Sequence, residues 1–136
     1  MKIYLSLIYR FSITGIMVTL EYNLKKINEM YKFEEGWDGY DANPISKEIL
    51  DLTKNLLKRI KMQPEVFPVA TGGIQLEYEK GNNYLEIELC ENSLSLFMIN
   101  EKDKDSFSIK SYYEFRGINS ISDYINLLIE EYVKGW

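Results

Sequence analysis

The spacing of apolar residues changes near Gly73, and this change limits the folds open to the chain. Before it, apolar residues recur every three or four positions, as they do along one side of an α-helix. After it, they alternate with polar residues, as in strands that bury one face. Helical spacing returns near the C-terminus. Helices that are separated in sequence from a run of strands predict an α+β fold with an antiparallel sheet.

Two helices are predicted in the N-terminal half and one at the C-terminal end. Thr19 and Ser46 precede apolar stripes and are predicted N-caps, because their side chains can accept a hydrogen bond from the first helical turn. Ser120 and Asp123 have the spacing of a capping box. The predicted helices cover residues 19–34, 47–61 and 121–134.

A meander of about four strands is predicted between the second and third helices. Residues 63–68 contain two prolines and are predicted to form an extended connector. The first two strands flank Gly81-Asn82, a dipeptide typical of tight hairpin turns. Two further strands are predicted at 94–99 and 106–113.

The first sixteen residues allow two interpretations. Their alternation of apolar and polar side chains predicts an extra N-terminal strand, or they are an extension before a true start at Met17. They lack the unbroken apolar run of a signal peptide and are too short to span a bilayer, so a cytoplasmic protein without membrane contact is expected. Residues 1–136 are predicted to form a single α+β domain, because 136 residues suit one hydrophobic core.

The composition excludes several kinds of chemistry. The chain has no histidine, which removes Ser-His-Asp and Cys-His catalysis and His-ligated zinc. Cys90 is the single cysteine, so neither an intramolecular disulfide nor a cysteine-rich metal site can form. No basic cluster near Cys90 in the sequence would activate it, and an inert thiol is expected. The sequence predicts no catalytic residues, no cofactor and no resident metal.

The charge of the chain is uneven. The formal net charge is −5, and residues 69–136 carry 12 acidic against 6 basic residues. An acidic half repels phosphate backbones, so direct binding of nucleic acid is disfavoured. It suits a basic protein partner instead, although the same charge also keeps a protein soluble.

Four glutamates are predicted to share one face of the first hairpin. A two-residue turn at Gly81-Asn82 places Glu77 opposite Glu86, and Gln75 opposite Glu88, with Glu79 on the same side. Like charges that face each other across a strand pair are unfavourable by up to about 1 kcal/mol. The face is therefore a solvated surface that water screens, a surface for a basic protein partner, or a metal site.

A glycine-rich loop at residues 36–46 forms a second candidate surface. Trp37 and Tyr40 lie among glycines and acidic residues, and aromatic side chains in such loops can anchor a partner. In the alternative interpretation, Trp37 fills the seam between the helices and the sheet, while Asp38 and Asp41 bond loop amides. The predicted partner-binding residues are Glu77, Glu79, Glu86, Glu88, Trp37, Asp38, Tyr40 and Asp41.

Four segments of the chain resemble a group of small, uncharacterised bacterial and mobile-element proteins. They are GWDGYDANPIS at 36–46, PEVFP at 64–68, GGIQLEY at 72–78 and LEIE at 85–88, within a region of resemblance over about residues 20–90. Asp41 stands where those proteins have glycine, and Tyr78 where they have tryptophan. The resemblance implies membership of this group and carries no activity.

The leading hypothesis is a non-catalytic, acidic interaction protein of a phage or mobile element. It would inhibit a nucleic-acid-handling host machine, such as a CRISPR–Cas effector, by occupying a basic groove. An exposed sheet edge also permits a homodimer. The alternatives are an accessory subunit of a toxin–antitoxin system and a metal-dependent nuclease or hydrolase. The carboxylates available to the nuclease are Asp38, Asp41, Glu77, Glu86 and Glu88.

Overall fold

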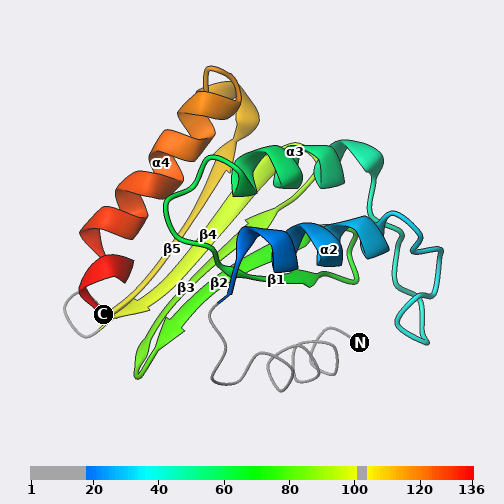
Figure 1. Cartoon of the computed structure of the whole chain (residues 1–136), viewed down its shortest axis with the longest axis horizontal. Helices are drawn as coiled ribbons and strands as arrows, with labels where there is room; N and C mark the ends of the chain where they lie inside the picture. The colour runs from blue at the N-terminus through cyan, green and yellow to red at the C-terminus, as the bar shows by residue number, and fades with distance from the viewer. Residues whose placement is uncertain (1–17, 101–103) are drawn as a thin grey trace.

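The computed structural model describes residues 18–100 and 104–136, and it has the α+β architecture predicted from the sequence (Figure 1). Two helices precede five strands, and a third helix follows them. The elements are α2 (Leu20–Met30), α3 (Lys47–Leu57), β1 (Glu65–Pro68), β2 (Ile74–Lys80), β3 (Asn83–Leu89), β4 (Ser93–Asn100), β5 (Lys104–Ser111) and α4 (Gly117–Glu131). Short 3-10 helices, η1 (Tyr112–Glu114) and η2 (Val133–Gly135), flank α4. The N-terminal strand predicted within residues 1–16 lies outside the described residues.

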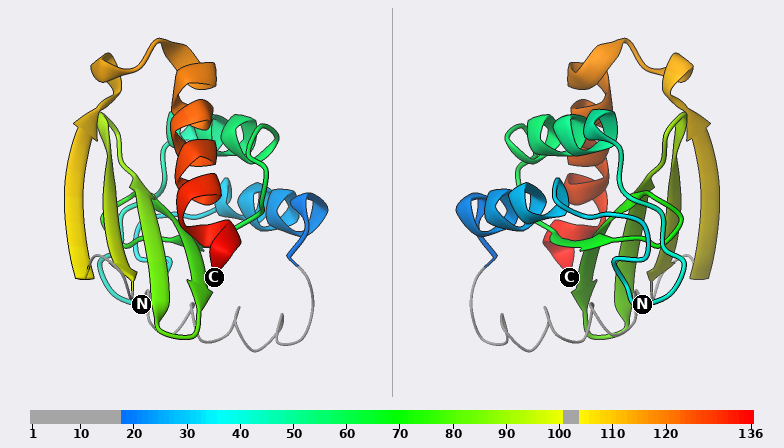
Figure 2. Two further views of the ribbon diagram at one scale, coloured as in Figure 1. Left: turned by 90° about the vertical axis from the view of Figure 1, so that its left-hand side faces the viewer. Right: turned by 90° about the vertical axis from the view of Figure 1, so that its right-hand side faces the viewer.

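The five strands form one antiparallel sheet in the order β1-β2-β3-β4-β5, which is a simple meander. All three helices lie on the same side of this sheet, so the molecule has a helical layer and a sheet layer (Figure 2). None of the helices within 18–100 and 104–136 is long and apolar enough to cross a membrane.

The sheet has one strand more than the predicted meander of four. The segment predicted as an extended connector contains β1, which pairs with β2 from Glu65 opposite Glu77 to Pro68 opposite Ile74. A proline cannot donate a backbone hydrogen bond, but an edge strand needs its N–H groups on one side only. β1 is such an edge strand, and this position accommodates Pro68.

The two N-terminal helices begin as predicted and end earlier. Thr19 and Ser46 are the N-caps, and their hydroxyl oxygens accept hydrogen bonds from Tyr22 N and Ile49 N at 3.1 and 3.2 Å. The first helix ends at Met30, four residues before the predicted end, and the second likewise ends at 57. Beyond both ends the chain continues in tight turns, because the next amides bond to carbonyls three or four residues back.

The prediction for the start of the C-terminal helix was wrong. α4 begins at Gly117 and not after Ser120, and Arg116 occupies the N-cap position without a side-chain hydrogen bond. Ser111 and Glu114 form a capping box that starts η1. This turn leads the chain from β5 towards α4, so the helix begins before the serine that resembled its cap.

The hydrophobic core lies between the sheet and the helical layer. One cluster of buried residues joins α2, α3 and α4 to the side of the sheet that faces them. We call this side the inner face. On β2, β3 and β4 it consists of Ile74, Leu76, Tyr78, Leu85, Ile87, Leu89, Leu94, Leu96 and Met98. Strand positions alternate, so the residues next to these along each strand face away from the helices.

Candidate functional site

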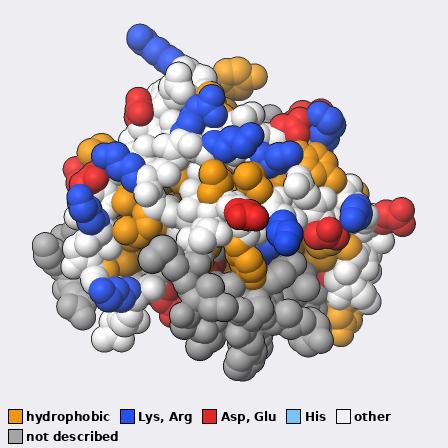
Figure 3. Space-filling view, viewed as in Figure 1, with side chains coloured by type: hydrophobic (Ala, Val, Ile, Leu, Met, Phe, Trp, Pro, Cys, Tyr) orange, Lys and Arg blue, Asp and Glu red, His pale blue; other side chains and the backbone are white. Residues whose placement is uncertain are grey.

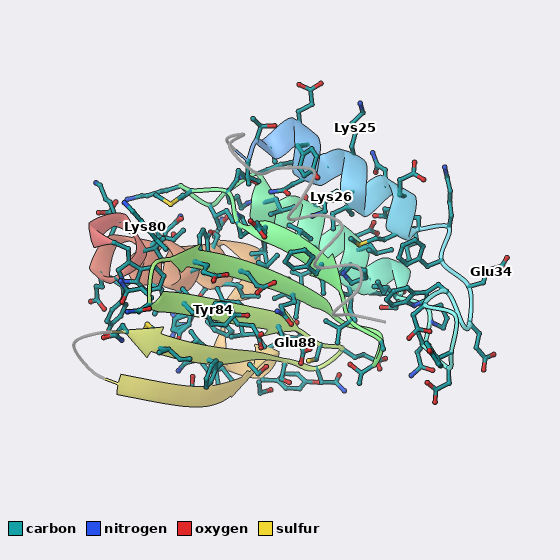
Figure 4. All side chains as sticks on the ribbon, turned by 90° about the horizontal axis from the view of Figure 1, so that it is seen from below. Lys25, Lys26, Glu34, Lys80, Tyr84 and Glu88 are labelled. Atoms are coloured by element: carbon teal, nitrogen blue, oxygen red, sulfur yellow. The ribbon has the colours of Figure 1, made fainter. Side chains whose placement is uncertain are left out.

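The predicted acidic residues of the hairpin do share one side of the sheet. β2 and β3 pair in the predicted register, with Glu77 opposite Glu86 and Gln75 opposite Glu88. We call the side away from the helices the outer face. On β2, β3 and β4 it consists of Gln75, Glu77, Glu79, Tyr84, Glu86, Glu88, Ser93, Ser95, Phe97 and Ile99. Figure 4 looks onto this face, from which Tyr84 and Glu88 project.

A tyrosine hydroxyl bridges the two facing glutamates. Tyr84 donates a hydrogen bond to Glu77 Oε1 at 2.6 Å, and its hydroxyl oxygen also lies 2.8 Å from Glu86 Oε1. Gln75 Nε2 donates to the same hydroxyl at 3.3 Å. Burial, followed by the hydrogen bonds and charges of the two glutamates, raises the pKa of Tyr84 above its ordinary value. The phenol therefore stays protonated and remains a donor to the carboxylates at physiological pH.

The glutamates differ in how far a partner could reach them. Glu77 is only 4% exposed, and Gln75 beside it is 2% exposed. Glu86 and Glu88 are half-buried, and Glu79 is exposed. Of the four glutamates predicted to bind a partner, Glu77 is therefore too buried for a partner to contact. Glu79, Glu86 and Glu88 form the accessible acidic surface.

A lysine from the helical layer supplies positive charge near Glu77. Lys26 of α2 is 6% exposed, and its Nζ lies 4.8 Å from the centre of the Phe67 ring. Burial lowers the pKa of Lys26 to about 8, against the opposing charges of Glu65 and Glu77. Lys26 thus partly offsets the buried acidic charge of Glu77.

The thiol of Cys90 lies at the end of the acidic row. Cys90 Sγ donates to Glu88 Oε2 at 3.6 Å. Burial, together with the charge of Glu88 and this hydrogen bond, raises the pKa of Cys90 to about 11. A thiol that stays protonated at neutral pH is a poor nucleophile, in agreement with the inert thiol expected from the sequence.

Apolar side chains from β4 border the accessible glutamates. Phe97 is the register partner of Glu86, and Ile99 is the partner of Tyr84. Phe97 is half-buried and Ile99 is 37% exposed, and the rings of Tyr84 and Phe97 lie 6.4 Å apart. The outer face thus combines carboxylates with aromatic and aliphatic surface, a mixture that suits protein contacts better than solvation alone.

Trp37 and Asp38, two of the residues predicted to bind a partner, fix the shape of the glycine-rich loop by contacts within the protein. The Trp37 ring stacks on Phe33 at 4.9 Å, and its Nε1–H donates to Asn43 O at 2.7 Å. Asp38 Oδ1 accepts from Tyr40 N at 2.9 Å and from Ala42 N at 3.3 Å. Trp37 therefore braces the loop itself and does not fill the seam between helices and sheet.

Two residues of this loop remain available at the surface. Tyr40 is 68% exposed, and Asp41 is also exposed. They extend from a loop whose shape is set by Trp37 and Asp38, so the loop presents one aromatic ring and one carboxylate to solvent.

The loop also borders a groove at the start of α3. Two adjoining hollows of about 240 and 400 Å³ share Ser46, Ile49, Cys90 and Glu91 in their walls. Among the described residues, no group of three or more His, Cys, Asp or Glu side chains is arranged to hold a metal ion.

Five residues of the outer face and its surroundings were not among the predicted site residues. Tyr84 and Gln75 were recoverable from the hairpin register, and Phe97 and Ile99 from the alternation within 94–99. No sequence signal relates Lys26 to this face, because its contacts with β1 arise from packing between residues about forty positions apart.

Comparisons of the chain with protein-family models, with curated proteins and with solved structures found no match.

Proposed function

We propose that this chain is a non-catalytic protein-binding module and that its outer face docks onto a basic surface of a partner protein. The observation that carries the proposal is the position of Glu86 and Glu88. Both are partly accessible, and among the side chains that the structure describes no lysine or arginine lies within ion-pair distance of either. Carboxylates without an internal counter-ion attract a cationic partner over long range.

The apolar neighbours of these glutamates support a protein as the partner. Charge complementarity speeds association and selects the partner, while buried aromatic and aliphatic contacts supply much of the affinity. Phe97 and Ile99 provide such contacts directly beside Tyr84 and Glu86. A free metal ion would gain nothing from this apolar border.

The distribution of basic residues also favours docking through the outer face. Lys and Arg side chains gather over α3 on the helical side of the molecule (Figure 3). Lys47 and Lys54 belong to α3, and Lys58 and Arg59 follow directly after it in the chain. A basic partner is therefore repelled from this part of the helical side, and the acidic outer face is the favoured approach.

The partner class we propose is a protein with a basic groove for nucleic acid, such as a CRISPR–Cas effector. Such grooves hold a phosphate backbone by its charge and shape, so an acidic face can compete for them. Docking would then inhibit the partner by occlusion and would require no chemistry from this chain.

Charge reversal on the outer face tests the proposal. Wild-type protein and the Glu86→Lys/Glu88→Lys variant are compared by biolayer interferometry on a guide-loaded Cas9-type effector, a histone octamer and lysozyme. We expect wild type to bind at least one nucleic-acid-binding probe at low salt. The double reversal should weaken that binding by at least about tenfold, since it replaces attraction with repulsion. Added salt should weaken it as well.

The matched control carries the same change in net charge elsewhere. Glu34→Lys/Glu131→Lys alters two exposed residues of the α2–α3 loop and α4. It should bind nearly as wild type does. Binding that survives the outer-face reversal, equal losses in both variants, or no binding to any probe would overturn the proposal. Glu77→Lys is unsuitable, because Glu77 is buried and its substitution would disturb folding.

A further inference from the structure

A groove lies at the end of the sheet where β2 begins and β3 ends. It consists of the two adjoining hollows of about 240 and 400 Å³ at the start of α3, and we call it the end groove. Its walls come from the first turn of α3, the β1–β2 turn, the β3–β4 turn and the start of η1. The residues that line it include Ser46, Ile49, Gly72, Cys90, Glu91 and Tyr112.

Hydrogen bonds within the chain fix the walls of the end groove. The Tyr112 hydroxyl donates to Cys90 O at 2.7 Å, which holds the tyrosine side chain beside the β3–β4 turn. Asn43 N donates to Ala70 O at 2.8 Å and ties the glycine-rich loop to the β1–β2 turn. Ile49 is 6% exposed and adds an apolar wall. The groove is therefore already formed in the free chain, as binding grooves commonly are.

The end groove continues the acidic row of the outer face. Cys90 lines both hollows, and its thiol donates to Glu88 Oε2 at 3.6 Å. The glycine-rich loop lines the larger hollow through Asn43 and Pro44. The groove thus lies between the accessible glutamates and the glycine-rich loop, so a partner that docks on the outer face reaches the groove without crossing the helical layer.

The rim of the smaller hollow is acidic. Glu48 and Glu91 both line it, and both are exposed. Lys47 precedes Glu48 in the chain, but its ammonium group bonds to Asp51 Oδ2 at 2.7 Å. The smaller hollow therefore combines apolar walls with two carboxylates, and the carboxylates attract a positively charged group.

We propose that the end groove receives a lysine or arginine side chain of the basic partner that docks on the outer face, an inference that rests on the proposed function. Such a side chain has an apolar stem and a charged end. The stem packs on Ile49 and Tyr112, while the charged end meets Glu48 and Glu91. An acidic side chain would be repelled by the rim, and an uncharged one would gain nothing from it.

Titration with single amino-acid derivatives tests the groove without a partner protein. Nuclear magnetic resonance of isotope-labelled protein follows the backbone amide signals of Ile49, Cys90 and Glu91. We expect N-acetylarginine amide to shift these signals at millimolar concentration, whereas N-acetylglutamate amide should leave them unchanged. Glu48→Gln/Glu91→Gln should raise the dissociation constant of the arginine derivative about fivefold, because it removes both rim charges.

Binding to a protein tests the same groove in its proposed setting. Biolayer interferometry on the guide-loaded effector and the histone octamer compares wild type with Glu48→Gln/Glu91→Gln. The variant should bind about fivefold more weakly. The matched control, Glu34→Gln/Glu131→Gln, neutralises two exposed glutamates elsewhere and should bind as wild type does. Circular dichroism checks that both variants fold.

The outcomes separate this inference from the proposed function. Arginine-induced shifts that spread evenly over the exposed carboxylates would overturn the inference. Protein binding that is equal in wild type and Glu48→Gln/Glu91→Gln would overturn it too, and the proposed function would stand if Glu86→Lys/Glu88→Lys still weakened binding. Arginine-induced shifts confined to the groove, with no binding to any protein probe, would overturn the proposed function and support the groove as a site for cationic side chains.

Discussion

A single hydroxyl group separates two carboxylates at the centre of the outer face. Glu77 and Glu86 are direct partners across β2 and β3, an arrangement that is unfavourable for two negative charges. Tyr84 lies within hydrogen-bond distance of both. The Tyr84 hydroxyl has one proton, so it donates to one carboxylate at a time. Its oxygen in turn accepts a hydrogen bond from Gln75 Nε2. The hydrogen bonds of Tyr84 and Gln75 thus partly offset the repulsion between the carboxylates of Glu77 and Glu86.

The buried Lys26 should make stability depend on pH above neutrality. Its pKa in the folded protein is about 8, below the 10.5 of an exposed lysine. Between these values the unfolded chain binds more protons, so stability increases as pH rises. Relative to Lys26→Met, wild type should gain about 2 kcal/mol in the free energy of unfolding between about pH 7 and about pH 10.

Urea denaturation followed by circular dichroism measures this difference at each pH. The comparison with Lys26→Met cancels the tyrosine and cysteine ionisations that both proteins share. Parallel pH profiles for the two proteins would contradict the assigned role of Lys26, whatever their difference at neutral pH.

At the scale of elements, the start of β2 depends on a close approach between two backbones. A Cβ atom added to Gly73 would lie 2.8 Å from Leu89 O on β3. Neither backbone can move without disturbing the β2–β3 pairing that sets the outer-face register. Gly73→Ala should therefore reduce the free energy of unfolding by about 2 kcal/mol.

Gly135→Ala, in η2, is the matched control for Gly73→Ala, because a Cβ atom added to Gly135 meets nothing within 4 Å. Its stability should stay close to that of wild type. Chemical denaturation of the two variants measures the difference, and equal stabilities would show that the strand pair tolerates the extra methyl group.

At the scale of the whole molecule, one core joins the helical layer to the sheet. Leu56 of α3 is 0% exposed and belongs to the cluster that spans both layers. Leu56→Ala should lower the free energy of unfolding by about 3 kcal/mol, since it removes packing and leaves a cavity. Leu127→Ala, at a position that is 55% exposed, should change stability by less than about 0.5 kcal/mol.

Two spectroscopic signals reveal whether the molecule unfolds as one unit. Tryptophan fluorescence reports on Trp37 in the α2–α3 loop and on Trp136 beside the core, while circular dichroism reports on all helices and strands. Both transitions should shift together in Leu56→Ala. Separate midpoints would mean that the two layers unfold independently and that the cluster is not one cooperative core.

The sequence by itself determined the features that depend on neighbours along the chain. The N-caps at Thr19 and Ser46 follow from side chains that bond to amides three residues ahead. The facing of Glu77 and Glu86 follows from a two-residue turn and the strict alternation of strand positions. Local geometry sets both, so local patterns predicted them.

Only the tertiary structure decided which of these residues are accessible. It buried Glu77 beside Lys26, left Glu86 and Glu88 partly exposed, and brought Phe97 next to them from β4. It also made Pro68 part of an edge strand. Burial and edge position depend on elements distant in sequence that pack against one another, and the spacing of residues along one segment contains no information about that packing.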